Sequence, residues 1–180
     1  MPSSTARADL WDTIAREAGA ESALWTAALK PRAEQERAPV FSTLGEERYA
    51  LGIESIYEGY LLHYGRPRLF APEDSDTSLL LGDYLYAHGL VRIEEVGTVD
   101  AVNDLAELIA LSAYLQAEQI AGDGAVWAAT SALLGGRALD DARSSLRLDN
   151  DPGPLERQAR AQAGDAPVTA ALAAHRERLR

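Results

Sequence analysis

Apolar residues recur along most of the chain at spacings of three and four, the period of amphipathic helices. Residues that favour helices, chiefly Ala, Leu, Glu and Arg, are abundant, and no run alternates apolar and polar positions as a half-buried strand would. We therefore predict an all-α protein. The expected helices cover about residues 8–18, 21–29, 42–63, 77–96, 98–120, 124–134 and 168–179, with a short one ending near 148.

Glycine and proline mark the expected breaks between these helices. Pro31 ends the second helix, and Gly65 followed by Pro67 ends the third. Gly97 separates two long helices, which predicts an antiparallel helical hairpin. Few apolar residues and several turn formers follow residue 148. We expect a single helical domain over 1–148 with a core at about 42–135, then a linker at 149–167 and a C-terminal helix at 168–180.

The composition limits the classes of function. The chain has no cysteine, which excludes disulfides and thiolate metal sites and favours a cytoplasmic protein. It shows no export signal and no apolar stretch long enough for a membrane span. The net charge is −11, and residues 70–136 hold eleven carboxylates and one cation, Arg92. This charge disfavours nucleic acids and anionic lipids as partners and suits a cation or a basic protein face, although dispersed carboxylates can also serve solubility alone.

Two sets of carboxylates have a spacing that suits metal binding. Glu54 and Glu58 lie four positions apart on one expected helix, and Asp100, Asp104 and Glu107 share a face of another. Oxygen ligands of this kind hold Mg²⁺ together with the phosphates of a substrate. The alternative is that both sets are solvated helix faces. Motifs for nucleotide binding, serine hydrolysis and di-iron centres do not occur in the sequence.

A cationic cluster follows the end of the third expected helix. His63, Arg66 and Arg68 could bind a phosphate or a carboxylate through bidentate donors, or could form a solvated helix end. His88 is interpreted as a core or interface histidine. The tyrosines of the two most apolar helices are expected in the core, and could also wall an isoprenoid-sized pocket. These are Tyr57, Tyr60, Tyr64, Tyr84 and Tyr86.

Several segments resemble the trans-isoprenyl diphosphate synthases. The stretch ESIYEGYLLH at 54–63 is similar to the family's E-[LI]-[IL]-H-x-A-S-L-[IL]-H helix, and LLGDYLYA at 80–87 resembles its L-[LA]-G-D-x-L-x-A helix. Gly65-Arg66-Pro67 looks like the remains of its R-R-G-x-P loop, and the helix that ends at Gln119 is similar to one closing with G-E-x-x-Q. The resemblance covers about residues 51–119 and implies a truncated bundle of antiparallel and orthogonal helices of the isoprenoid-synthase type.

The departures from the family pattern affect its catalytic residues. Tyr64 and Gly65 stand where the resemblance places the first two catalytic aspartates. The pair Asp140 and Asp141 is not followed by the third aspartate that the family's second motif requires. In the family those aspartates bind the Mg²⁺ that neutralises the leaving diphosphate, so the resemblance implies a chain that does not transfer prenyl groups alone. It assigns the remnants of the diphosphate site to Glu54, Glu58, His63, Arg66, Arg68, Asp83 and Gln119.

This combination is similar to the small non-catalytic subunit of heteromeric prenyl diphosphate synthases. The resemblance implies a helical interface over 77–119 with a catalytic prenyl synthase subunit or with a second copy. One alternative is a retired synthase fold kept as a homodimeric structural or apolar-ligand-binding module. Another is an active enzyme that holds Mg²⁺ through Glu54, Glu58, Asp100 and Asp104, and only this last reading needs a cofactor. The expected interface residues are Leu81, Tyr86, His88 and Val91.

The segment SLLLGDYLYAHGLV within 77–119 carries more apolar surface than one helix face can bury, which also favours an interface. We further predict that Gly82 allows a close approach between helices. The side chains expected in the core are Leu80, Leu85, Leu105 and Leu108.

Overall fold

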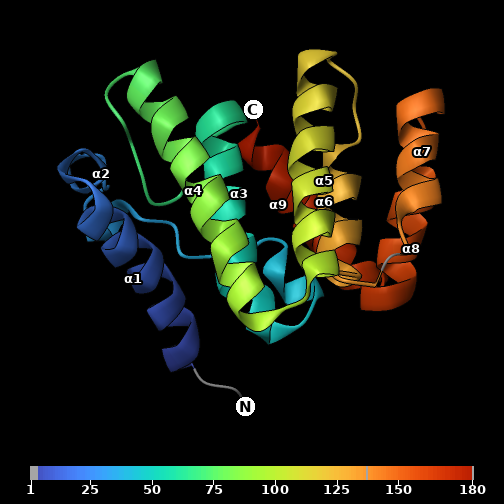
Figure 1. Ribbon diagram of the computed structural model, residues 1–180, viewed down its shortest axis with the longest axis horizontal. Helices are drawn as coiled ribbons and strands as arrows, with labels where there is room; N and C mark the ends of the chain where they lie inside the picture. Colours follow the sequence, from blue (N-terminus) through green and yellow to red (C-terminus); the bar gives the residue numbers. More distant parts are fainter. Residues whose placement is uncertain (1–3, 137, 180) are drawn as a thin grey trace.

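The computed structural model describes residues 4–136 and 138–179, which are predominantly helical and form no β-strand (Figure 1). The prediction of an all-α fold is therefore confirmed. Within these residues, no helix has both the length and the apolar character that crossing a membrane requires. The helices are α1 (Ser4–Glu21), α2 (Ala23–Ala27), α3 (Ala50–Tyr64), α4 (Ser75–Val96), α5 (Val99–Ala117), α6 (Asp123–Ala132), α7 (Asp140–Asp149), α8 (Gly153–Ala163) and α9 (Asp165–Arg178), with short 3₁₀ turns at Arg32–Glu34, Ser42–Leu44 and Glu47–Tyr49.

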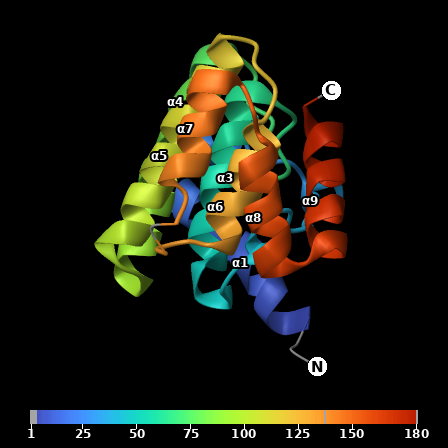
Figure 2. The same cartoon turned by 90° about the vertical axis from the view of Figure 1, so that its right-hand side faces the viewer.

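The helices surround a central pair, α3 and α6. Figure 2 shows α4 and α5 on one side of this pair, and α8 and α9 on the other. α1 and α2 lie at one end of the molecule, and α7 lies at the other end against α8 (Figure 1). The main apolar core contains buried residues from Val40 to Leu172, and a second cluster joins α1 and α2 to α3 and α4.

α3 and α4 pack closely through two pairs of glycines. Gly59 faces Gly82 and Gly52 faces Gly89, so the glycines of each antiparallel helix lie seven residues apart. A methyl group on Gly59 would lie 2.8 Å from the Gly82 carbonyl oxygen, and one on Gly52 would lie 3.0 Å from the Gly89 carbonyl oxygen. The prediction that Gly82 allows a close approach between helices is confirmed, and the neighbouring helix is α3.

α4 and α5 run in opposite directions on either side of Gly97 and Thr98, as predicted for a hairpin (Figure 1). Each helix begins at a side-chain cap. Asp74 accepts a hydrogen bond from the Thr77 amide at 2.7 Å, and Thr98 accepts one from the Ala101 amide at 3.3 Å. These local bonds explain why both helix starts could be predicted.

One leucine of this hairpin is exposed, although it was predicted in the core. Leu85, Leu105 and Leu108 are buried as expected, whereas Leu80 is 58% exposed. Because α4 turns Gly82 and Gly89 toward α3, Leu80 falls on the outer face of the helix.

The predicted linker at 149–167 is wrong, because most of it forms α8. Pro154 lies in the first turn, where a missing amide donor costs no intrahelical bond, while Leu155 and Ala159 are buried on the side that packs against α6. Gly164, with φ of 92°, then connects α8 directly to α9. The domain therefore does not end at 148, since both C-terminal helices contribute to the main core. The last residue of the predicted C-terminal helix, 180, lies outside the described residues.

Candidate functional site

The two glutamates predicted on α3 as metal or diphosphate ligands lie at the centre of the protein. Glu54 and Glu58 are one helical turn apart, and both form ion pairs with Arg68, in the segment between α3 and α4. All three side chains are fully buried. The guanidinium also lies over the rings of Trp11 and Tyr57, 4.6 and 5.0 Å from their centres.

Every charged atom of this buried centre has a hydrogen-bond partner. Glu58 accepts from Arg68 Nε at 3.0 Å and from the Leu69 amide at 2.7 Å. Glu54 accepts from Arg68 Nη1 and from two backbone amides at 3.1 Å, those of Val40 and Ser42. Arg68 also donates to two carbonyl oxygens, those of Ala38 and Glu54. The centre joins α3 to the segment before it and to the segment after it.

This arrangement leaves no carboxylate surface for a ligand. Burial alone would lower the pKa of Arg68, but the charges of Glu54 and Glu58 hold it above its ordinary value. Asp104 of α5, another predicted Mg²⁺ ligand, is also buried and pairs with Arg143 at 2.9 Å. Across residues 4–136 and 138–179, no three His, Asp or Glu side chains converge as a metal site would require. The structure gives no support to an enzyme that binds Mg²⁺ through these residues.

Arg66, which was predicted to bind phosphate beside His63 and Arg68, instead caps the C-terminal helix. Its amide donates to the Arg178 carbonyl oxygen at 2.9 Å, and its guanidinium donates to the Glu177 carbonyl oxygen at 2.7 Å. A cation at this position interacts favourably with the negative end of the α9 dipole. Since Arg68 is buried against Glu54 and Glu58, the predicted cationic cluster is not present as one surface.

The other predicted remnants of a diphosphate site have separate environments. His63 Nε2 lies 3.2 Å from Asp83 Oδ1 without the alignment of a hydrogen bond, and its ring stacks on Tyr86. Asp83 is 71% exposed. Gln119 is exposed in the turn that follows α5. Of the seven predicted residues, the structure brings together Glu54, Glu58 and Arg68, and separately His63 and Asp83.

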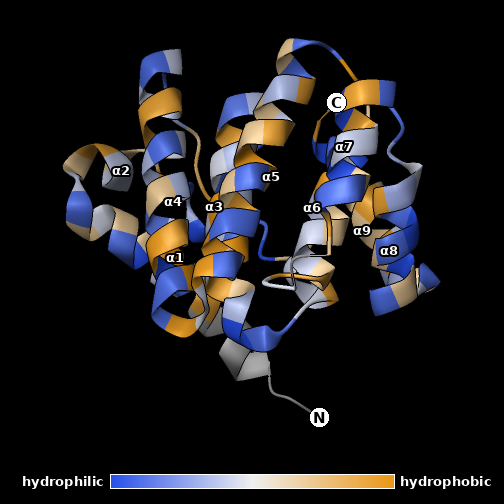
Figure 3. Cartoon of the chain, turned by 45° about the vertical axis from the view of Figure 1, so that its right-hand side comes forward, coloured by the Kyte–Doolittle hydropathy of each residue, from blue (hydrophilic) through white to orange (hydrophobic). Residues whose placement is uncertain are grey.

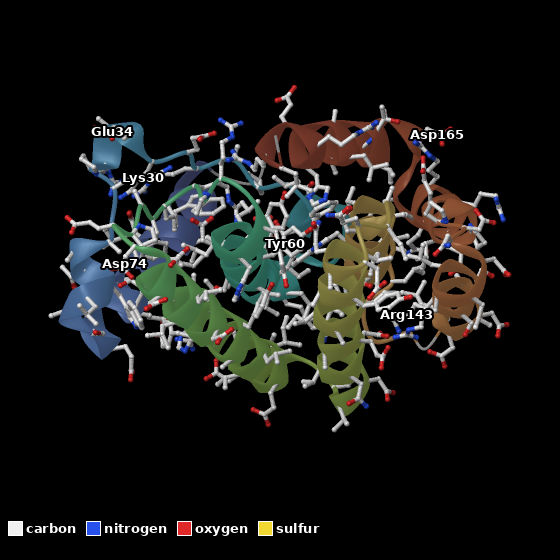
Figure 4. All side chains as sticks on the ribbon, turned by 90° about the horizontal axis from the view of Figure 1, so that it is seen from above. Lys30, Glu34, Tyr60, Asp74, Arg143 and Asp165 are labelled. Atoms are coloured by element: carbon white, nitrogen blue, oxygen red, sulfur yellow. The ribbon has the colours of Figure 1, made fainter. Side chains whose placement is uncertain are left out.

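A groove of about 540 Å³ lies beside the segment that connects α3 to α4. Lys30 and Asp74, which both line it, lie toward the same end of the molecule in Figure 4. The Lys30 ammonium donates to the Pro67 carbonyl oxygen at 2.7 Å, and Glu36 pairs with Arg178 at 2.7 Å. The groove therefore combines opposite charges that already bind protein groups, which is a poor setting for a diphosphate.

A buried polar network fastens α9 to the helices at the centre. His175 lies between the Tyr57 hydroxyl, 2.9 Å from Nδ1, and Asp123 Oδ2, 2.9 Å from Nε2. Tyr60, near the middle of Figure 4, donates to the same carboxylate at 2.5 Å and accepts from Gln116 at 2.7 Å. Burial alone would raise the pKa of Asp123, but the hydrogen bond and charge of His175 hold it below its ordinary value.

The predicted interface residues differ in their access to a partner. The prediction for Leu81 needs correction, because its side chain is buried in the cluster that joins α1 to α4. Tyr86 stacks on His63 with ring centres 5.1 Å apart, and His88 binds Glu17 of α1 at 2.8 Å. Val91 is 52% exposed. Three of the four predicted interface residues, Leu81, Tyr86 and His88, are therefore engaged in contacts within the chain.

Other apolar side chains of α4 and α5 are exposed. Figure 3 shows apolar positions along both helices, which form one outer side of the molecule in Figure 2. In the described part of the chain, most large apolar side chains that are exposed belong to these two helices: Leu79, Leu80, Val91, Val96, Val99 and Tyr114. We call the exposed surface of the two helices the α4–α5 face.

No protein-family model matches the chain, and comparisons with curated proteins and with solved structures found no match. The resemblance to the isoprenyl diphosphate synthases therefore rests on the sequence motifs within residues 51–119 alone.

The sequence prediction missed the residues that hold the C-terminal helices in place. Asp123 and His175 belong to no recognisable motif, and Arg143 lies in a polar helix with few apolar residues. One available signal was the position of His175, seven residues after Val168 and three after Leu172, on the stripe that α9 buries. That spacing indicates a histidine directed into the core.

Proposed function

We propose that this chain is a non-catalytic subunit of polyprenyl diphosphate biosynthesis, located in the cytoplasm, that contacts a catalytic prenyl synthase through the α4–α5 face. The observation that carries the proposal is the gathering of exposed apolar side chains on these two helices. Exposed apolar surfaces of this kind usually mark contact sites. The resemblance supports the same region, because its LLGDYLYA block lies within α4.

The closed centre around Arg68 supports a non-catalytic role. Mg²⁺ that binds a substrate diphosphate needs accessible carboxylates, whereas Glu54 and Glu58 are buried against Arg68. We expect the purified chain with Mg²⁺ to show no condensation of isopentenyl diphosphate with an allylic diphosphate, as measured by product chromatography. Robust turnover that a folded Glu58→Gln variant abolishes would contradict the proposal.

Co-expression with the full-length prenyl synthases of the host tests the partner. We expect the wild-type chain to co-purify with a synthase at a fixed ratio and to change its rate or product length. A Leu80→Ser, Val91→Ser variant should lose this association, since it removes apolar contact area from α4. Leu24 and Leu148 are exposed on other helices, so Leu24→Ser, Leu148→Ser is the matched control and should still co-purify. Absence of any synthase from the wild-type preparation would overturn the proposal.

A further inference from the structure

We infer that the partner of the α4–α5 face is a different chain with a basic, apolar helical surface, rather than a second copy of this chain. This inference rests on the proposed function for its location and adds the chemistry of the partner. It follows from the way charges surround the apolar residues of α4.

The outward side of α4 carries an apolar stripe. Leu80, Ala87 and Val91 are spaced by seven and four residues, so they lie on one side of the helix, opposite Gly82 and Gly89. All three are exposed, Leu80 and Val91 at more than half of their full accessibility. The glycine contact with α3 thus determines which side of α4 remains for a partner.

An acidic edge runs beside this stripe. Asp76, Asp83 and Glu94 lie at the adjacent positions of the helix, and all three are exposed. α4 itself contains four carboxylates and one guanidinium, Arg92. Arg92 is already paired with Glu17 and Glu95. The stripe therefore lies in a region of negative potential.

Neighbouring cations that the structure describes do not reverse this charge. Arg16 of α1 lies 3.9 Å from Glu17, and Arg48, which reaches the end of α4, pairs with Glu46 at 3.0 Å. Arg147 of α7 is bound to Glu107 of α5. Each of these cations thus already has a carboxylate close by, so none of them offsets the acidic edge of Asp76, Asp83 and Glu94.

A second copy would place two surfaces of the same sign together. In a symmetric dimer each copy contributes the same patch, so the carboxylates of both acidic edges would crowd one apolar contact. Like charges across an interface suppress association, whereas a basic surface would gain both attraction and faster encounter. The charge of the face therefore selects a basic heterologous helix that presents apolar residues to the stripe.

A synthetic amphipathic helix of leucine and lysine, about 18 residues long, is a suitable probe. We expect it to bind the full chain with one-to-one stoichiometry in calorimetry at about 0.05 M salt, and to weaken at about 0.5 M. Leu80→Ser, Val91→Ser should weaken binding at least about tenfold, and so should Asp76→Asn, Asp83→Asn, Glu94→Gln. The control Glu34→Gln, Asp141→Asn, Asp149→Asn removes the same charge from exposed sites elsewhere and should bind as the wild type does.

Binding that neither α4 variant weakens would overturn the inference, because the peptide would then contact another surface. So would a dimer of the pure chain in light scattering that the stripe variant disrupts and that forms equally at both salt concentrations. If the peptide binds the stripe as expected but no prenyl synthase co-purifies, the basic-partner surface stands and the proposed function fails.

Discussion

At the scale of single residues, buried charges join segments that are far apart in the sequence. Arg68 binds Glu54 and Glu58 of α3, and Arg143 of α7 binds Asp104 of α5. A buried charge is tolerated only when it is paired and hydrogen-bonded, so removing one partner leaves the others uncompensated. These side chains therefore stabilise the fold.

The substitution Arg68→Met tests this role. It leaves two buried carboxylates without a cation, and we expect the free energy of unfolding to fall by about 3–5 kcal/mol. Urea denaturation at about pH 7 measures the loss. Arg157→Met on the exposed side of α8 is the control and should change stability by less than about 0.5 kcal/mol. If Arg68→Met lowered the free energy of unfolding by less than about 1 kcal/mol, the buried ion pairs would not be important for the stability of the fold.

The Asp123 carboxylate gives stability a dependence on pH. Its pKa is lower in the folded protein than in an unfolded chain, where it is about 3.9, so ionised Asp123 stabilises the fold above that pH. This contribution disappears as pH falls through the folded pKa. We expect the gap in melting temperature between wild type and Asp123→Asn to narrow between about pH 5 and about pH 3. A gap that stays constant over this range would contradict the assignment.

At the scale of elements, the α3–α4 pair determines the orientation of both helices. The glycine pairs Gly59 with Gly82 and Gly52 with Gly89 bring the two backbones together. This contact buries one side of α4 and leaves Leu80 and Val91 on the other. Access of the α4–α5 face to a partner is thus a consequence of helix packing.

Gly82→Leu should disrupt this packing. A side chain at Gly82 meets the His63 ring at 2.6 Å and the Gly59 carbonyl oxygen at 3.2 Å, and we expect a loss of about 1–3 kcal/mol by denaturant unfolding. The same enlargement on the outer side of α4, Ala87→Leu, meets solvent and should change stability by less than about 0.5 kcal/mol. Equal melting temperatures for wild type and Gly82→Leu would count against close packing of α3 on α4.

At the scale of the whole molecule, the C-terminal helices complete the core. Leu155 and Ala159 of α8 and Val168 and Leu172 of α9 are buried in the same cluster as the residues of α3 and α6. His175 adds a polar connection from α9 to Tyr57 and Asp123. The region after residue 148 is therefore part of the folding unit.

A chain shortened to end at Asn150 tests this conclusion. Without α8 and α9, the surface of α6 that packs against these two helices would be exposed, and we expect no cooperative thermal transition by circular dichroism. The full chain under the same conditions is the reference. A shortened chain that unfolds cooperatively at the wild-type temperature would restore the prediction of a dispensable linker and tail.

Local signals explain which elements could be predicted. The ends of α3 and α4 depend on Gly65, Pro67, Asp74 and Gly97, which act on residues close to them in the chain. α8 could not be predicted in the same way. Its buried side is narrow, and Pro152 and Pro154 at its start are typical of a turn, so the helix depends on the packing of Leu155 against α6.

By itself the sequence determined the helical class, most of the breaks between helices and the acidity of the middle of the chain, because these depend on near neighbours or on composition. Only the tertiary structure decided whether a carboxylate is accessible to a ligand or forms a buried ion pair, and which side of α4 faces outward. Both depend on segments distant in sequence. Glu54 accepts hydrogen bonds from Arg68 and from the amides of Val40 and Ser42, and Asp123 is hydrogen-bonded to His175, 52 residues later. Spacing within one helix carries no information about such partners.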